Sequence, residues 1–393
     1  RQGLGLIKEM RGGVAIMDSR PVSSHERAVF LSANETFPLA FGQLGVYRSI
    51  VRRSDLSLHS SLPNLTTLVV TDCVSPREAQ ERLTSLEVRH EALRVRIDFE
   101  ASPEPLQMVL NPRAAEFPVM NSSLEDWSSI KSKFEELDHF QGYLWHAVII
   151  HDVETRRVGV GLVVSHLIAD AWALNILRRE LSNGVGLSST RAPSLRTAVT
   201  SERARWYAGS VAADRSLERW VAALASLTEA TSSIGQETRV HRVQETWSAE
   251  LSALLSARGV GLTSLALDGY ASNFLRDGEE QLICLVASNR IRKVDCELVC
   301  SLIQPVPLIL RRSSRSSADA ISELNREVIS ALAVSRFHPD VVEDHLDGGV
   351  SSTGDGFPMV LNVHNAPSFL ARPESRPPVD ERWTEAKPRG FVN

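Results

Sequence analysis

The chain has 393 residues, of which 43% are hydrophobic and 23% are charged, a composition that excludes a disordered or fibrous protein and predicts two folded lobes. Its formal net charge is −5 and acidic and basic residues are interleaved, which argues against the concentrated basic face of a nucleic-acid-binding protein. No run of about 18 apolar residues predicts a membrane span, and four cysteines are too few for a disulfide scaffold, so we expect reduced thiols in a cytoplasmic protein.

The first part of the chain alternates between predicted strands and helices. We interpret residues 1–36 as an N-terminal extension, with a short strand at 14–17. A helix is expected after Ser75, because Pro76 suits the first helical position and Glu78 can complete a capping box. The other elements expected here are a helix over residues 43–51 and strands over 65–70, 95–97, 106–110 and 147–150.

The strand expected over residues 159–164 is apolar on both faces, which predicts a central position in a sheet. It runs into His166, and a helix is expected to begin near Asp170. Leucines at helical spacing form one face of that helix: Leu174, Leu177 and Leu181.

A stretch rich in glycine, proline and serine, residues 182–194, is the best linker in the chain. The elements expected beyond it are helices over residues 200–213, 216–227, 248–258, 263–276 and 316–333 and strands over 281–287, 299–310 and 359–363. Both halves mix strands and helices, so we expect an N-terminal lobe over residues 37–185 and a C-terminal lobe over residues 186–393.

His166 is the first candidate for chemistry. Side chains at a strand end emerge from a sheet into a cleft, and an imidazole can accept a proton near neutral pH. Asp170 follows one helical turn later, where it can orient the ring or anchor the turn through a basic partner. Taken alone, this spacing favours a structural histidine followed by an aspartate that caps a helix.

The neighbourhood of His166 changes that interpretation. Residues 165–172 read Ser-His-Leu-Ile-Ala-Asp-Ala-Trp, which resembles the signature His-His-x-x-x-Asp-Gly, followed by Trp, of the condensation domains of nonribosomal peptide synthetases. These domains belong to a superfamily with the chloramphenicol acetyltransferase fold. Further segments resemble the family's other motifs in the same order: residues 37–43, 89–94, 204–207 with 217–220, 289–292 with 299–308, and 359–367. The resemblance covers about residues 37–367.

The sequence departs from the family pattern at several positions. Ser165 replaces the first histidine of the signature, and Ala171 replaces its glycine. Cys300 and Gln304 replace a glycine and an asparagine, and His146 stands where an arginine is common. The chain also ends at residue 393, before the family's final strands, so we expect an incomplete C-terminal lobe.

The resemblance implies an α/β fold of two chloramphenicol acetyltransferase-like lobes in a V-shaped pseudo-dimer with a substrate tunnel between them. His166 would be catalytic, and Asp170 would support the motif by pairing with Arg290 across the lobes or, as a second candidate, with Arg94. His90 is expected to be structural. The residues expected to line the tunnel are Ser165, Ala171, Trp172, Gln304, Asn362 and His364, although core packing is the stronger expectation for Trp172.

The activity implied is transfer of an acyl or aminoacyl group from a thioester to an acceptor amine or hydroxyl. The donor would be held on the phosphopantetheine arm of a peptidyl or acyl carrier protein or on coenzyme A. The acceptor would be a small molecule or a second tethered group, the chain a monomer, and no metal or permanently bound cofactor is implied. The departures at Ser165 and Ala171 motivate the alternatives: a catalytically inactive platform that binds a carrier protein or partner enzyme, or a coenzyme A-dependent O-acyltransferase. Both a free-standing protein and an excised domain remain open, and the N-terminal extension favours the former.

Overall fold

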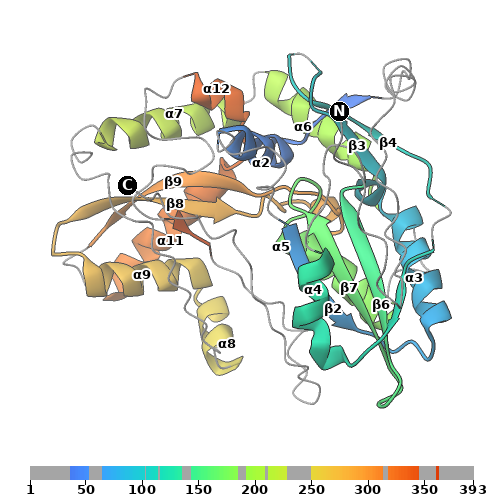
Figure 1. Cartoon of the computed structure of the whole chain (residues 1–393). Coiled ribbons are helices and arrows are strands. Elements are labelled where there is room, and N and C mark those ends of the chain that lie inside the picture. Colours follow the sequence, from blue (N-terminus) through green and yellow to red (C-terminus); the bar gives the residue numbers. More distant parts are fainter. Residues whose placement is uncertain are drawn as a thin grey trace, which may run out of the picture. The chain divides into compact units, whose positions relative to one another are not determined.

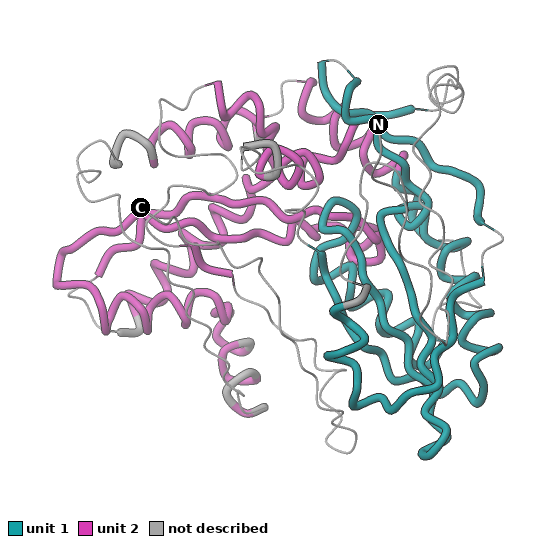
Figure 2. Tube along the Cα trace, in the orientation of Figure 1, with its two compact units in different colours: residues 1–37, 56–195, 377–393 teal, residues 38–55, 196–376 magenta. Residues whose placement is uncertain are grey.

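The computed structural model describes residues 36–52, 64–101, 103–113, 116–134, 143–184, 192–208, 211–227, 249–312, 317–344 and 360–362. The described residues fall into two compact units (Figure 2). The chain passes from unit 1 to unit 2 at residues 195–196, and the earlier segment 38–55 belongs to unit 2. The sequence predicts this segment in the first lobe and the boundary at residues 185–186.

Unit 1 is built on a four-stranded sheet with the order β2-β7-β6-β5 (Figure 1). Strand β7 pairs antiparallel with both β2 and β6, and β5 runs parallel to β6. The elements of this unit are β2 (Asn64–Val70), α3 (Pro76–Arg89), η1 (Glu91–Arg94), β3 (Val95–Asp98), β4 (Leu106–Val109), β5 (Val119–Asn121), η2 (Leu124–Asp126), α4 (Trp127–Phe134), β6 (Trp145–Asp152), β7 (Arg157–Ser165) and α5 (Ala171–Asn183), preceded by β1 (Phe37–Pro38). The predicted central position of β7 is confirmed.

Helices cover both faces of the unit 1 sheet. Helix α4 packs on the face that carries Val148 and Ile150, through Trp127 and Ile130. An added Cβ at Gly161 of β7 would overlap the indole ring of Trp127, so this glycine makes room for the helix. Side chains alternate between the two faces of a strand. Helix α3 and its neighbour α5 pack on the sheet face opposite α4.

Helix α3 begins as its sequence predicts. The hydroxyl of Ser75 accepts a hydrogen bond from the amide of Glu78 at 3.3 Å, and Pro76 is the first helical residue. The Glu78 carboxylate accepts in return from the amide of Val74 at 2.9 Å. These local contacts fix the start of the helix without help from distant segments.

Unit 2 contains the sheet order β10-β8-β9, in which β8 pairs parallel with β10 and antiparallel with β9. Its elements are α2 (Phe41–Arg52), α6 (Leu195–Tyr207), α7 (Val211–Leu227), α8 (Ala249–Ala257), α9 (Leu262–Phe274), β8 (Glu280–Ala287), α10 (Lys293–Cys296), β9 (Gln304–Arg311), α11 (Ser317–Ala333), α12 (Pro339–Glu343) and β10 (Val360–Leu361). Helices α9 and α11 lie on one face of this sheet and α7 on the other (Figure 1).

Helix α6 differs from its predicted bounds. It spans Leu195–Tyr207 rather than residues 200–213. The carboxylate of Glu91 accepts hydrogen bonds from the amide of Leu195 at 2.7 Å and from the hydroxyl of Ser194 at 3.0 Å. A residue about a hundred positions earlier therefore caps the helix, and no local pattern could reveal this.

Candidate functional site

His166 lies in a tight turn at the exit of β7 in unit 1. The strand ends at Ser165, and the carbonyl of Ser165 accepts from the amides of Ile168 and Ala169 at 3.0 and 3.2 Å. His166 keeps partial exposure, whereas its neighbours Ser165 and Leu167 are fully buried. The chain thus forms a hydrogen-bonded turn directly after the central strand, and His166 is the partly exposed residue of that turn.

Asp170 ends that turn and begins helix α5. Its carboxylate oxygen Oδ1 accepts from the amide of Ala173 at 2.8 Å, and its carbonyl accepts from the amide of Leu174 at 2.8 Å. The residue is fully buried and has the extended backbone typical of an N-cap. The aspartate therefore ties the His166 turn to the start of the helix.

The electrostatic surroundings favour a neutral imidazole. Burial lowers the pKa of His166, because protein atoms surround the ring although part of the residue reaches solvent. The carbonyl of His166 itself, the charge of Asp170 and the carbonyl of Ala169 oppose this and raise the pKa, but by less. A neutral imidazole can accept a proton from an incoming nucleophile.

His90 has the structural surroundings that the sequence predicts. The residue is 2% exposed and caps the C-terminus of α3. Its Nε2 lies 2.8 Å from Oε2 of Glu180, and Nε of Arg89 donates to the other carboxylate oxygen at 3.2 Å. Glu180 is on α5, so this buried cluster joins α3 to the helix that follows His166.

Arg94 binds backbone carbonyls within unit 1. Its guanidinium donates to the carbonyls of Glu87 at 3.0 Å, Leu110 at 2.5 Å and Val88 at 3.5 Å. These contacts join the end of α3 to the residue after β4. The arginine thereby supports the scaffold around residues 89–94, and its pairing with Asp170 stays a prediction.

The prediction that Trp172 packs in the core is wrong, because the residue is 38% exposed. In a helix, two residues correspond to about 200° of rotation, so Trp172 points away from the side on which Leu174 is buried. Ala171, the first residue of α5, is partly buried. A tunnel-lining role for either residue stays a prediction.

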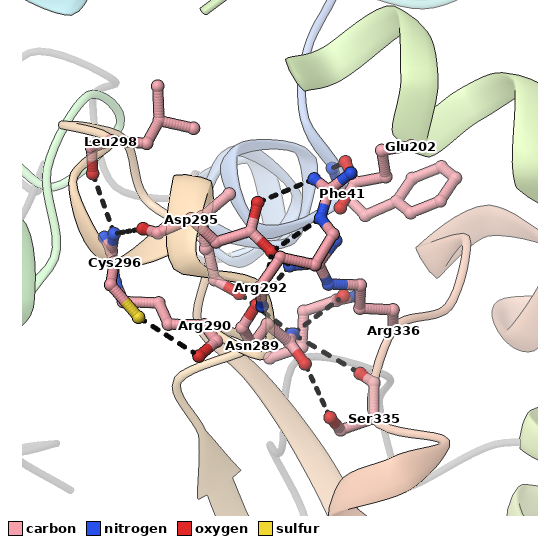
Figure 3. Close-up of polar contacts among 12 residues, drawn as sticks. Phe41, Glu202, Asn289, Arg290, Arg292, Asp295, Cys296, Leu298, Ser335 and Arg336 are labelled. Atoms are coloured by element: carbon pink, nitrogen blue, oxygen red, sulfur yellow. Dashed lines mark hydrogen bonds and ion pairs between the residues drawn. The ribbon is translucent and has the colours of Figure 1, made fainter. Parts of the chain in front are cut away.

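Arg290, in unit 2, organises the loop between β8 and β9 (Figure 3). One terminal nitrogen of its guanidinium donates to the carbonyls of Asp295 at 2.5 Å and Leu298 at 2.7 Å, and the other donates to the carbonyl of Cys300 at 2.9 Å. These bonds hold the segment before β9 curled around the arginine. The strand accordingly begins at Gln304 rather than at the predicted residue 299. Pairing of Arg290 with Asp170 stays a prediction.

Asn289 and Gln304 belong to a buried amide network in unit 2. Asn289 adopts a left-handed backbone with φ of 56°, which asparagine tolerates better than most residues. Its side-chain amide donates to the carbonyl of Leu302 at 2.9 Å and to Oε1 of Gln304 at 3.2 Å. Gln304 is 1% exposed and donates to the carbonyl of Phe337 at 2.7 Å. The side-chain amide of Gln304 is thus hydrogen-bonded within the loop scaffold, which argues for a structural rather than a tunnel-lining role.

A cluster of charges that the sequence did not single out lies beside this loop. Asp295 accepts from Arg292 at 2.6 and 3.0 Å and from Arg336 at 2.7 Å. Together with Glu202 of α6 these residues line a cavity of about 10 Å³, room for roughly one water molecule. Burial raises the pKa of Glu202, and Arg336 is the strongest opposing influence. Arg336 lies about forty residues after Arg292 and Asp295, so the sequence pattern does not bring the three together.

Asn362 is exposed, and His364 lies outside the described residues, as does the strand predicted at 14–17.

Within the described ranges, no cluster of three or more histidine, cysteine, aspartate or glutamate side chains is suited to a metal ion. Across the same part of the chain, none of the helices combines the length and apolarity that a bilayer crossing needs.

Comparison with known proteins supplies a curated relative but no family model that matches the sequence. The chain is similar to chondramide synthase cmdD of Chondromyces crocatus, with 25% identity over 198 residues. The similarity covers 48% of this chain and 5% of the synthase, so the chain matches a small part of a much longer protein.

Solved structures show the likeness over most of the chain. A mutant starter condensation domain of rhizomide synthetase RzmA, in complex with C8-CoA and Leu-SNAC, matches with a TM-score of 0.64 and 16% identity over 87% of this chain and 81% of that chain. The first condensation domain of the calcium-dependent antibiotic synthetase matches with a TM-score of 0.61 and 16% identity, over 85% of this chain and 82% of that chain. The condensation domain of the Monacolin K polyketide synthase MokA matches with a TM-score of 0.62 and 14% identity, over 80% of this chain and 76% of that chain. The chain therefore has the chloramphenicol acetyltransferase-like α/β fold of condensation domains, as its motifs predict.

Proposed function

We propose that the chain is a condensation-type acyltransferase that joins an acyl or aminoacyl thioester to an acceptor amine, or to a hydroxyl, in natural-product synthesis. The observation that carries the proposal is the turn at the end of β7. It presents His166 with a lowered pKa between a strand fixed in the sheet and a helix capped by Asp170. The condensation-domain fold and the similarity to a chondramide synthase support the same class of reaction.

The reaction needs one nucleophile, one thioester and one proton acceptor. The acceptor nitrogen attacks the thioester carbonyl, a bond forms between nitrogen and carbon, and the carbon–sulfur bond breaks. A ring nitrogen of His166 takes the proton that the amine loses, and the imidazolium then gives up that proton to the departing thiolate, which leaves as a thiol. A general base contributes about 10²- to 10⁴-fold, and holding the two reactants together contributes further. No covalent intermediate on the enzyme is required.

The comparison with the rhizomide synthetase domain supports a proposal for the carrier of the acyl group. The mutant rhizomide synthetase domain was solved in complex with C8-CoA and Leu-SNAC. For this chain we propose a donor on coenzyme A or on the phosphopantetheine arm of a carrier protein, and a small-molecule or tethered acceptor. Arg290 and Asp170 would support the site by pairing between the units, and Ala171, Trp172 and Asn362 would line the substrate path.

The direct test is turnover by the purified chain. We would incubate it with C8-CoA and Leu-SNAC, and in parallel with an acyl carrier protein thioester, and detect the amide by mass spectrometry. The proposal expects product with at least one donor and none with heat-denatured chain. Absence of product with every donor, together with measurable binding of carrier protein, would favour the second candidate, an inactive platform. The departures at Ser165 and Ala171 motivate that candidate.

A further inference from the structure

Ser165 binds each of the three backbone amides that follow His166. Its hydroxyl accepts from the amide of Leu167 at 3.2 Å. Its carbonyl accepts from the amides of Ile168 at 3.0 Å and Ala169 at 3.2 Å. Leu167 is fully buried, so water cannot replace the hydroxyl as the acceptor for its amide. One residue thus determines the path of the backbone through the turn.

Ser165 is itself fixed in the sheet. Its amide donates to the carbonyl of Leu144 at 2.8 Å, and it lies opposite Asn64 in the pairing of β2 with β7. The residue is 0% exposed. The serine is therefore held by β2 on one side and by the residue before β6 on the other, and His166 follows it directly. Its hydroxyl is used within the turn, in contrast to the tunnel-lining role that the sequence suggested.

We infer that Ser165 is a positioning residue of the proposed acyl transfer: its hydroxyl, bound to the amide of Leu167, fixes where the imidazole of His166 stands. The inference rests on the proposed function. An imidazole carried by a turn that has lost one of its three bonds would occupy a range of positions. Misplacement of a reacting group by about 1 Å can cost on the order of 100-fold in rate.

Two substitutions at this position separate the hydroxyl from the rest of the side chain. Ser165→Ala removes the acceptor and adds no bulk, whereas Ser165→Thr keeps a hydroxyl. Ser264→Ala is the matched control, because Ser264 is also 0% exposed and donates a buried hydrogen bond to Asn325 at 2.8 Å, but in unit 2. Ser165→Cys, which keeps a weak acceptor, replaces Ser165→Ala if the latter does not fold by circular dichroism.

The activity arm measures kcat, KM and the pH profile of kcat. We expect Ser165→Ala to lower kcat by about 10- to 100-fold with KM unchanged, Ser165→Thr to recover most of that loss, and Ser264→Ala to behave like the wild type. Wild-type kcat in Ser165→Ala, or an equal loss in Ser165→Ala and Ser264→Ala, would overturn the inference.

A second arm does not depend on turnover. Hydrogen–deuterium exchange at the imidazole carbon, read by mass spectrometry, gives the pKa of His166 in each variant. We expect Ser165→Ala to raise this pKa toward the ordinary histidine value, because a displaced ring gains solvent, and Ser165→Thr to leave it low. If the wild type transfers no acyl group, the proposed function fails, and this titration alone tests whether Ser165 positions the imidazole of His166. Identical titrations in the wild type and Ser165→Ala would then overturn the inference.

Discussion

The carboxylate of Asp170 accepts a hydrogen bond of 2.8 Å from the amide of Ala173, so the acidic residue of the His166 segment caps helix α5. The same carboxylate raises the pKa of His166 through its charge. Asp170 therefore has a mechanical effect on the turn and an electrostatic effect on the imidazole, and substitutions can separate them.

Asp170→Asn keeps the capping oxygen and removes the charge, whereas Asp170→Ala removes both. Because asparagine caps about as well as aspartate, we expect Asp170→Ala to lower the free energy of unfolding by about 1 kcal/mol and Asp170→Asn to lower it by much less. Both variants should lower the pKa of His166 further. Denaturant unfolding and imidazole exchange measure the two effects. An equal loss of stability in both variants would show that the charge, not the cap, is what the aspartate contributes, as pairing with Arg290 implies.

Gly42 and Gly45 provide a matched pair in helix α2. An added Cβ at Gly42 would lie 2.6 Å from the carbonyl oxygen of Ser301 and 2.7 Å from the carbonyl carbon of Leu302, both backbone atoms that cannot swing aside. An added Cβ at Gly45 meets nothing within 4 Å. We expect Gly42→Ala to destabilise the chain by about 1–3 kcal/mol and Gly45→Ala to stabilise it by up to about 1 kcal/mol. Denaturant unfolding measures both, and tolerance of Gly42→Ala would refute the close packing of α2 on residues 301–302.

Glu202 should make the stability of the chain depend on pH. Its carboxylate accepts from the amide of Phe41 at 2.9 Å, and burial raises its pKa above the ordinary glutamate value. Between these two pKa values the folded chain binds more protons than the unfolded chain, so the free energy of unfolding falls as the pH rises through this window. Glu202→Gln does not ionise, and its amide oxygen can still accept from Phe41.

We therefore expect Glu202→Gln to be more stable than the wild type above the window and equally stable below it. Thermal unfolding over a pH series measures the difference. Glu297→Gln is the control, since Glu297 is exposed and its substitution should change little at any pH. A Glu202→Gln variant that is less stable than the wild type at neutral pH would contradict the account, because the ionised carboxylate would then be favourable in the folded chain.

Local signals predicted the elements that local contacts determine. The start of α3 follows from Ser75, Pro76 and Glu78, which are neighbours in sequence and in space. The central strand β7 follows from its unbroken apolar run, and the buried face of α5 from leucines at helical spacing. Helix α4 was missed although Trp127 and Ile130 carry the same spacing, because the helix is short.

Contacts between distant segments explain what the sequence could not show. The cap that Glu91 provides for α6 and the curl that Arg290 imposes before β9 both override local propensity. In the candidate site, the sequence singled out His166 and Asp170 by type and spacing. It placed Ser165 on a substrate path, because a serine hydroxyl bound to the next turn looks the same in sequence as one that faces a ligand.

The measurement that tests the central claim most directly is product formation by a His166→Ala variant. The assay uses C8-CoA with Leu-SNAC or the donor that the wild type prefers, and circular dichroism shows whether the variant is folded. A general base contributes about 10²- to 10⁴-fold, so we expect the folded variant to lose at least about 100-fold in kcat and to keep its KM. Wild-type turnover by folded His166→Ala would contradict the assignment of His166 as the residue that takes the proton of the acceptor.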